Sequence, residues 1–328
     1  MAFKLLSLIS TASLIVASVT FAADSVVIAE AEPTEFVRIC DQYGQGFFYL
    51  PGTDTCLKIG GYYRYEVAGT GGNFDGYFNY ARFAPTFSVK SETELGTLTG
   101  FVEAEMDWYA DGGTASRLLY SYVELGGFLA GLTKTPYARF LDSAGPTLFE
   151  GRYAYNQGGE FSYTYDNDKG FSAIVAVIDN EASGGWETNA EAGARYKRDD
   201  FTLGAIAGHD GVADSWGGRA TVRFKVPNTR LNVGLHGFYS SPDGEIGDYT
   251  IMDPVYERTE WSGLIGASAE LTPKVALSGT AQYFDTDAWE FSADLELTPV
   301  RGLAVTPELV YNTASEDWAG VLRFEHKF

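Results

Sequence analysis

Polar and apolar residues alternate with a period of two along most of the chain from Leu57 onward. The run 289–297 is the clearest case. In it, the apolar residues Trp289, Phe291, Ala293, Leu295 and Leu297 alternate with the polar residues Glu290, Ser292, Asp294 and Glu296. Successive side chains of a β-strand point to opposite faces, whereas a helical period of about 3.6 would mix the two sets. The run therefore predicts a strand with one apolar face and one polar face.

The same alternation recurs in sixteen runs, and their starts lie near Leu57, Ala81, Thr97, Arg117, Phe128, Glu160, Phe171, Ala190, Phe201, Trp216, Leu231, Thr259, Val275, Ala288, Leu303 and Trp318. Short connections rich in turn formers, such as 167–170 and 272–274, alternate with longer ones, such as 135–159 and 240–258. In the run 117–125, Leu and Tyr occupy both odd and even positions, so the sequence leaves open which side of this strand faces outward. Short turns at one rim and long loops at the other are typical of bacterial outer-membrane barrels.

We therefore predict an all-β fold, a transmembrane antiparallel β-barrel of about 16 strands over residues 57–328, with short periplasmic turns and longer extracellular loops. About sixteen strands leave a water-filled lumen, whereas about eight would be filled by side chains. The composition agrees, since aromatic residues make up 15% of the chain and glycines number 38. The alternative is a secreted soluble β-protein such as a propeller or lectin, which would carry polar outer faces. The apolar faces of the present strands argue against it, because in water they would promote aggregation.

The first 22 residues form a separate unit. Lys4 is followed by an apolar stretch over 5–19 and by small residues up to Ala22, which is the pattern of a cleaved signal peptide. The apolar stretch is shorter than the roughly 20 residues that a spanning helix needs. Residues 23–56 are then expected to form an N-terminal periplasmic segment. In an exported chain, its Cys40 and Cys56 favour a disulfide over two free thiols.

The charge of the chain is strongly negative. The formal net charge is −21, and without Lys4 the 22 remaining basic residues against 44 acidic ones give 22 − 44 = −22. Nucleic acid is excluded as a partner, because phosphate contacts need clustered lysine and arginine. A negative aqueous pore favours cations, although the local field at its narrowest point matters more than the total charge.

The stretch 40–67, CDQYGQGFFYLPGTDTCLKIGGYYRYEV, resembles the amino-terminal motif of the general porins of alphaproteobacteria, the rhizobial and Brucella type. Further matches lie in order along the chain at 91–98, 170–173 and 305–308, and in the ending Arg323-Phe324. The final aromatic Phe328 is similar to the C-terminal signature of outer-membrane barrels, while His326 stands where an apolar residue is usual.

This resemblance implies a homotrimer of sixteen-stranded barrels in the lipid and lipopolysaccharide of the outer membrane. Each barrel would have its own channel for passive transport of small hydrophilic solutes and ions, without a cofactor. In such trimers the loop after the fifth strand, the third long loop, folds into the barrel and narrows it. Here that place is 135–159, which is less acidic than we would expect for the family.

A constriction of this kind needs opposed charges, because a transverse field orients dipolar solutes. The candidates on the inward loop are Arg139, Asp142 and Glu150. Positions that alternate with the apolar face of each strand are expected to face the lumen. The basic candidates at such positions are Lys58, Arg64, Arg82, Arg195, Arg219, Arg223 and Arg323, and the acidic ones are Glu103, Glu105 and Asp107. Arg64, Arg82 and Arg323 lie on the first, second and last strands, so closure makes them neighbours in a basic wall. Alternatively, each of them pairs with a carboxylate on the same wall.

Two further functions are open at this point. A substrate-specific channel, for instance for sugars, would line its lumen with aromatic residues, and Tyr62, Phe101, Phe238 and Phe284 have lumen parity. Enzyme activity has little support, because the histidines form no His-Glu-x-x-His motif and the sequence contains no Gly-x-Ser-x-Gly elbow. We therefore predict no catalytic residue, no metal site and no enzyme.

Overall fold

The computed structural model describes residues 38–70, 74, 76–179 and 185–328. The predicted signal peptide, 1–22, and residues 23–37 of the predicted periplasmic segment lie outside the described residues and remain predictions. No helix among the described residues is long and apolar enough to cross a membrane.

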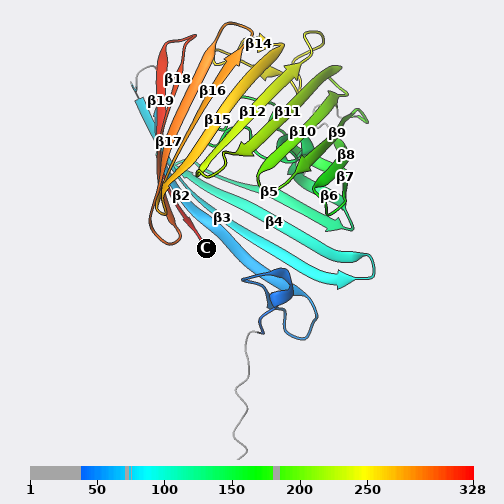
Figure 1. Cartoon of the computed structure of the whole chain (residues 1–328). Helices are drawn as coiled ribbons and strands as arrows, with labels where there is room; N and C mark the ends of the chain where they lie inside the picture. Colours follow the sequence, from blue (N-terminus) through cyan, green and yellow to red (C-terminus); the bar gives the residue numbers. More distant parts are fainter. Residues whose placement is uncertain (1–37, 71–73, 75, 180–184) are drawn as a thin grey trace, which may run out of the picture. The chain divides into compact units, whose positions relative to one another are not determined.

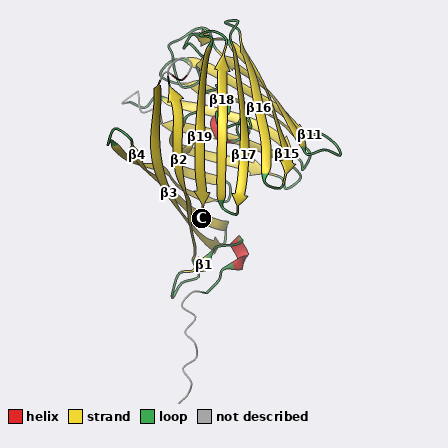
Figure 2. Ribbon diagram, turned by 90° about the vertical axis from the view of Figure 1, so that its left-hand side faces the viewer, coloured by secondary structure: helices red, strands yellow, loops and turns green. Residues whose placement is uncertain are grey.

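Sixteen of the described strands form a closed antiparallel barrel (Figure 1). They are β2 (Cys56–Thr70), β3 (Gly76–Thr93), β4 (Gly96–Tyr109), β5 (Thr114–Leu125), β6 (Phe128–Lys134), β7 (Gln157–Asp166), β8 (Phe171–Asp179), β9 (Thr188–Lys197), β10 (Phe201–Asp210), β11 (Ser215–Lys225), β12 (Leu231–Ser240), β15 (Trp261–Thr272), β16 (Val275–Phe284), β17 (Trp289–Val300), β18 (Leu303–Asn312) and β19 (Asp317–Lys327). Strand β19 pairs with both β18 and β2, and the pairing with β2 closes the ring (Figure 2). The predicted number of strands is confirmed; β3 shows the largest difference in its start, at Gly76 rather than Ala81.

The two faces of strands such as β8, β10 and β17 follow the predicted alternation. On β17, Trp289 and Phe291 are each 41% exposed on the outer face, while Glu290 and Ser292 are buried on the inner one. This is the pattern expected of a barrel that has lipid outside and polar groups inside. The register of β4 with β5 shifts next to Glu103, so β5 carries an irregularity that reverses its parity. That irregularity explains why the run 117–125 has similar residues on both faces.

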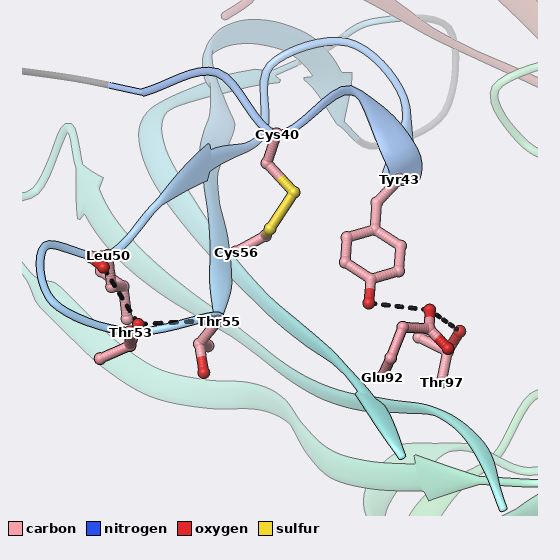
Figure 3. The surroundings of a disulfide bond; sticks show 8 residues. All are labelled: Cys40, Tyr43, Leu50, Thr53, Thr55, Cys56, Glu92 and Thr97. Atoms are coloured by element: carbon pink, nitrogen blue, oxygen red, sulfur yellow. Dashed lines mark hydrogen bonds between the residues drawn. A yellow bond between two sulfur atoms is a disulfide. The ribbon is translucent and has the colours of Figure 1, made fainter. Parts of the chain in front are cut away.

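The N-terminal segment precedes β2 and is joined to it by the predicted disulfide (Figure 3). It contains the 3-10 helix η1 (Asp41–Tyr43) and the short strand β1 (Phe48–Tyr49), which pairs with the start of β2. Cys40 and Cys56 are fully buried beside Phe47. The Tyr43 hydroxyl donates a hydrogen bond of 2.9 Å to Glu92 at the end of β3, which fixes the segment to the barrel rim.

Two long loops fold against the inner wall. The first, residues 135–156 between β6 and β7, contains the helix α1 (Pro136–Arg139) and is called L3 below. Helix α1 packs against β6, β8, β9 and β10 and therefore lies within the barrel, as predicted for the third loop. The second, residues 241–260 between β12 and β15, contains the short strands β13 (Ile251–Met252) and β14 (Arg258–Thr259), which pair with each other.

Candidate functional site

L3 is held against the wall by two apolar clusters. In the first, Tyr137, Phe140, Leu141 and Ala154 of L3 pack with Ile174, Ile206 and Tyr249. In the second, Ala144 of L3 packs with Phe238, Ile251, Leu264, Phe284 and Ala288, and Tyr153 lies at its edge. Phe238 and Phe284, two of the four residues considered for an aromatic track, are 3% and 0% exposed. They pack beneath L3 and do not line the open lumen. The hypothesis of an aromatic track through all four residues is therefore wrong.

Three of the predicted lumen arginines lie beneath L3 and bind its main chain. Arg195 donates a 2.7 Å hydrogen bond to the carbonyl oxygen of Phe140. Arg219, only 2% exposed, donates to the carbonyl oxygens of Tyr137 and Asp142, and Arg223 donates to that of Ser143. The last carbonyl groups of a short helix and of the turn that follows have no intrahelical partner, so these guanidinium groups satisfy them. These arginines face inward, as predicted, but most of their partners are backbone oxygens; only Arg223 also contacts a carboxylate, that of Asp142.

Carboxylates on the wall bind the backbone N–H groups of L3. The N–H of Tyr137 donates to Glu191 at 2.6 Å, that of Leu148 to Asp294 at 3.1 Å and that of Phe149 to Glu308 at 3.2 Å. Arg152 of L3 forms a two-pronged ion pair with Glu290, with Nε–Oε1 and Nη2–Oε2 distances of 3.0 Å. None of these four acids is among the site residues predicted from the sequence. Their inward parity was readable, but nothing local in the sequence connects them to L3.

The three predicted residues on L3 have different surroundings. Arg139 pairs with Glu160 and donates a 2.9 Å hydrogen bond to the carbonyl oxygen of Lys134. Asp142 accepts from Lys197 at 3.1 Å and from Arg223 at 3.3 Å. Glu150 is half-buried and has no cationic partner within ion-pair distance among the described residues; its hydrogen bond comes from the Tyr153 hydroxyl at 3.4 Å. Burial raises the pKa of the Tyr153 phenol, which keeps this donor protonated.

A second charged cluster lies where the barrel closes, on β19 and β2 to β5. It is called the ladder below and comprises Arg64, Arg82, Arg117 and Arg323 together with Glu66, Glu105, Asp107 and Glu325. Its members are direct cross-strand neighbours; for example, Arg64 lies opposite both Arg82 and Glu325. Closure places Arg64, Arg82 and Arg323 close together, but in the arrangement of the alternative, in which each pairs with a carboxylate, and not as a basic wall.

Every arginine of the ladder is paired with a carboxylate. Arg82 donates from Nε to Asp107 at 2.7 Å and from Nη1 to Glu105 at 2.5 Å. Arg64 pairs with Glu325 at 2.7 Å, and Arg323 pairs with Glu66. Four arginines face four carboxylates, so the ladder is close to neutral as a group. Opposite charges in contact favour the ionised form of both partners.

The remaining predicted wall residues lie apart from these contacts. Lys58 is directed at the ring of Phe47 in the N-terminal segment, 5.8 Å from its centroid. Glu103 is half-buried next to the ladder and forms no ion pair within the part of the chain that the structure describes. Arg117 was missed, because the irregularity in β5 hides its inward parity. Within the described ranges, no group of three or more His, Cys, Asp or Glu residues could hold a metal ion.

Comparison with known proteins decides the family. Residues 24–326 match the family model described as the porin subfamily. The chain belongs to this family of porins. Porin Omp2b of Brucella canis is 32% identical over 375 aligned residues, and porin Omp2a of Brucella suis is 31% identical over 376; both alignments cover 100% of each chain. The protein is therefore an outer-membrane porin, a multi-pass β-barrel channel.

Solved structures of more distant porins share the fold of this porin. A mutant of the Rh. blastica porin aligns with a TM-score of 0.59 at 14% identity, over 83% of this chain and 100% of the other. The anion-selective porin from Comamonas acidovorans aligns with a TM-score of 0.59 at 14% identity, over 84% of this chain and 100% of the other. At this level of identity the similarity supports the barrel architecture alone.

Proposed function

We propose that this porin is a general diffusion channel, through which small hydrophilic solutes and ions cross the outer membrane passively and without chemical change. The observation that carries the proposal is the organisation of the lumen. L3 is fixed to one part of the wall, and the charged ladder lies at the closure of the barrel, with its arginines and carboxylates bound to one another. Groups that already bind each other offer a polar, hydrated surface rather than a tight site for one solute.

A substrate-specific sugar channel has weaker support. Of its four aromatic candidates, Tyr62 and Phe101 lie on the inner wall, but Phe238 and Phe284 are covered by L3. The Tyr62 hydroxyl is also engaged, because it donates a 3.1 Å hydrogen bond to Glu105. The series of four aromatic residues that the sequence suggested is therefore interrupted by L3 at Phe238 and Phe284.

We further propose a weak preference for cations. The ladder is balanced, and Glu150 of L3 and Glu103 of β4, which lack cationic partners among the described residues, add negative charge near the narrow part of the lumen. The overall charge of −21 acts in the same direction. Arg139, Asp142 and the arginines beneath L3 then act mainly by holding the loop. We propose a homotrimeric assembly on the strength of the family relationship.

Single-channel recording of the refolded mature protein in a planar bilayer tests the proposal. We expect ohmic openings that close in groups of three, a reversal potential under a salt gradient that indicates a weak cation preference, and no saturable block by sugars. Saturable block by one sugar would replace general diffusion with a specific channel. A protein that inserts without conducting would overturn the channel proposal altogether.

A further inference from the structure

The long loop between β12 and β15 folds inward beside L3. This loop, residues 241–260, is called the clamp loop below. It buries two apolar side chains almost completely, since Tyr249 and Ile251 are each 1% exposed. Tyr249 belongs to the first apolar cluster under L3 and Ile251 to the second. The clamp loop therefore contributes one side chain to each of the two clusters that fix L3.

Tyr249 is joined to L3 by both its ring and its hydroxyl. The rings of Tyr249 and Tyr137 meet edge to face, with centroids 5.3 Å apart. The Tyr249 hydroxyl donates to Oε1 of Glu191 at 2.8 Å, and the N–H of Tyr137 donates to Oε2 of the same carboxylate at 2.6 Å. One carboxylate of β9 thus binds the clamp loop and the start of α1 together.

The barrel wall is shaped to receive the Tyr249 side chain. A Cβ atom at Gly208 would lie 2.3 Å from this ring, and a Cβ atom at Gly217 would lie 2.5 Å from the Cβ of Tyr249. These distances are too short for any larger residue without movement of the tyrosine. Adjacent strands β10 and β11 thus have glycines where Tyr249 approaches the wall.

Further contacts fix the clamp loop to the wall and to L3. The side chain of Asp248 accepts from Asn189 at 2.6 Å, and its N–H donates to Asp210 at 2.8 Å. The carbonyl oxygen of Asp248 accepts from Asn156 at the end of L3. The clamp loop is therefore held by the barrel and in turn contacts the beginning and the end of L3.

We propose that the clamp loop sets the position of L3 in the lumen, with Tyr249 and Ile251 as positioning residues for the constriction. This inference rests on the proposed diffusion function and deepens it, because the width of the channel then depends on two loops rather than on one. The wall also holds L3, through buried polar groups and through its own residues in the two apolar clusters. Tyr249 and Ile251 complete both clusters from the side of the clamp loop, and loss of either side chain would leave buried apolar surface of L3 without its partner.

The variant Tyr249→Ala tests the inference, with Ile246→Ala as a matched control, since Ile246 lies in the same loop and is 68% exposed. We expect Tyr249→Ala to raise the frequency of partial closures in single-channel records by at least about tenfold, because removal of a buried ring favours displaced states of L3. The voltage at which channels close should fall. Tyr249→Phe keeps the ring, so it should lie between wild type and Tyr249→Ala, and Ile246→Ala should match wild type.

Thermal unfolding of the barrel in detergent separates positioning from folding. We expect nearly equal melting temperatures for wild type, Tyr249→Phe and Ile246→Ala. Among these three proteins, only Tyr249→Phe should show more frequent closures. Closure records that are the same in Tyr249→Ala and wild type would overturn the inference while leaving the channel function intact. Conversely, a silent wild-type protein would refute the proposed function itself.

Discussion

Replacing Arg82 with alanine should make the channel more cation-selective. The change removes one of the four cations of the ladder and leaves its four carboxylates in place. Asp107 loses both of its hydrogen bonds from Arg82, at 2.7 and 2.9 Å, whereas Glu105 keeps its bond from Arg117 at 2.6 Å. Asp107 thus becomes an uncompensated negative charge on the inner wall.

The expected size of the effect follows from Coulomb's law. A monovalent cation passing about 7 Å from the new charge gains about 0.6 kcal/mol in water, and about half of that after screening at 0.1 M salt. An anion loses the same amount, so the ratio of cation to anion permeability should rise about threefold. The rise should be larger at lower ionic strength, because screening weakens there.

Reversal potentials under a salt gradient measure this ratio directly. Arg301→Ala is the matched control, since it removes the same charge from an exposed residue on the turn between β17 and β18. The double variant with Arg82→Ala and Asp107→Asn should return toward wild type, because it restores the balance of the ladder. An unchanged reversal potential in Arg82→Ala would show that ions do not pass near the ladder. An equal shift in Arg301→Ala would show that total charge, and not the local field, controls selectivity.

Three further predictions concern other parts of the chain. Glu150→Gln should shift the reversal potential toward anions in the same assay, because Glu150 has no cationic partner among the described residues; no shift would remove it from the ion path. Gly61→Ala should lower the stability of the refolded barrel by about 1–3 kcal/mol in urea titrations, because Gly61 has φ 145° and a Cβ atom there would lie 2.3 Å from the carbonyl oxygen of Ala84. The control Gly237→Ala should have little effect, since a Cβ atom at Gly237 would meet nothing within 4 Å. Replacing Cys40 and Cys56 with serine should lower stability by up to about 3 kcal/mol in the same titrations but leave conductance unchanged, and a loss of conductance would show that the segment shapes the pore.

The strands were predictable because lipid and water act on every second residue. Trp289 and Glu290 could be assigned to opposite faces from the sequence alone, and the structure places them so. The assignment was least clear on β5, where the register irregularity beside Glu103 changes the parity of the residues before it. Such an irregularity follows from backbone geometry and leaves no regular pattern in the sequence. For this reason Arg117 did not appear among the predicted wall residues.

The contacts of L3 could not be derived in the same way. Glu191 and Glu308 face the lumen, as their parity indicates, but their partners are N–H groups of a loop that is distant in the sequence. Tyr249 lies within a long loop without any alternation, so nothing marked it as buried. Contacts between loops depend on the position of both backbones, which local patterns do not specify.

Parity alone also cannot separate two kinds of lumen arginine. Arg219 binds carbonyl oxygens of L3 and is 2% exposed, so its charge is not cancelled, but it lies behind the loop and away from passing ions. Arg82 lies on the inner wall in the ladder, and its charge is balanced by Glu105 and Asp107. Neither kind contributes a strong positive field to the ion path, although both face inward. We therefore expect the six arginines assigned to the lumen wall by sequence to leave the preference for cations intact.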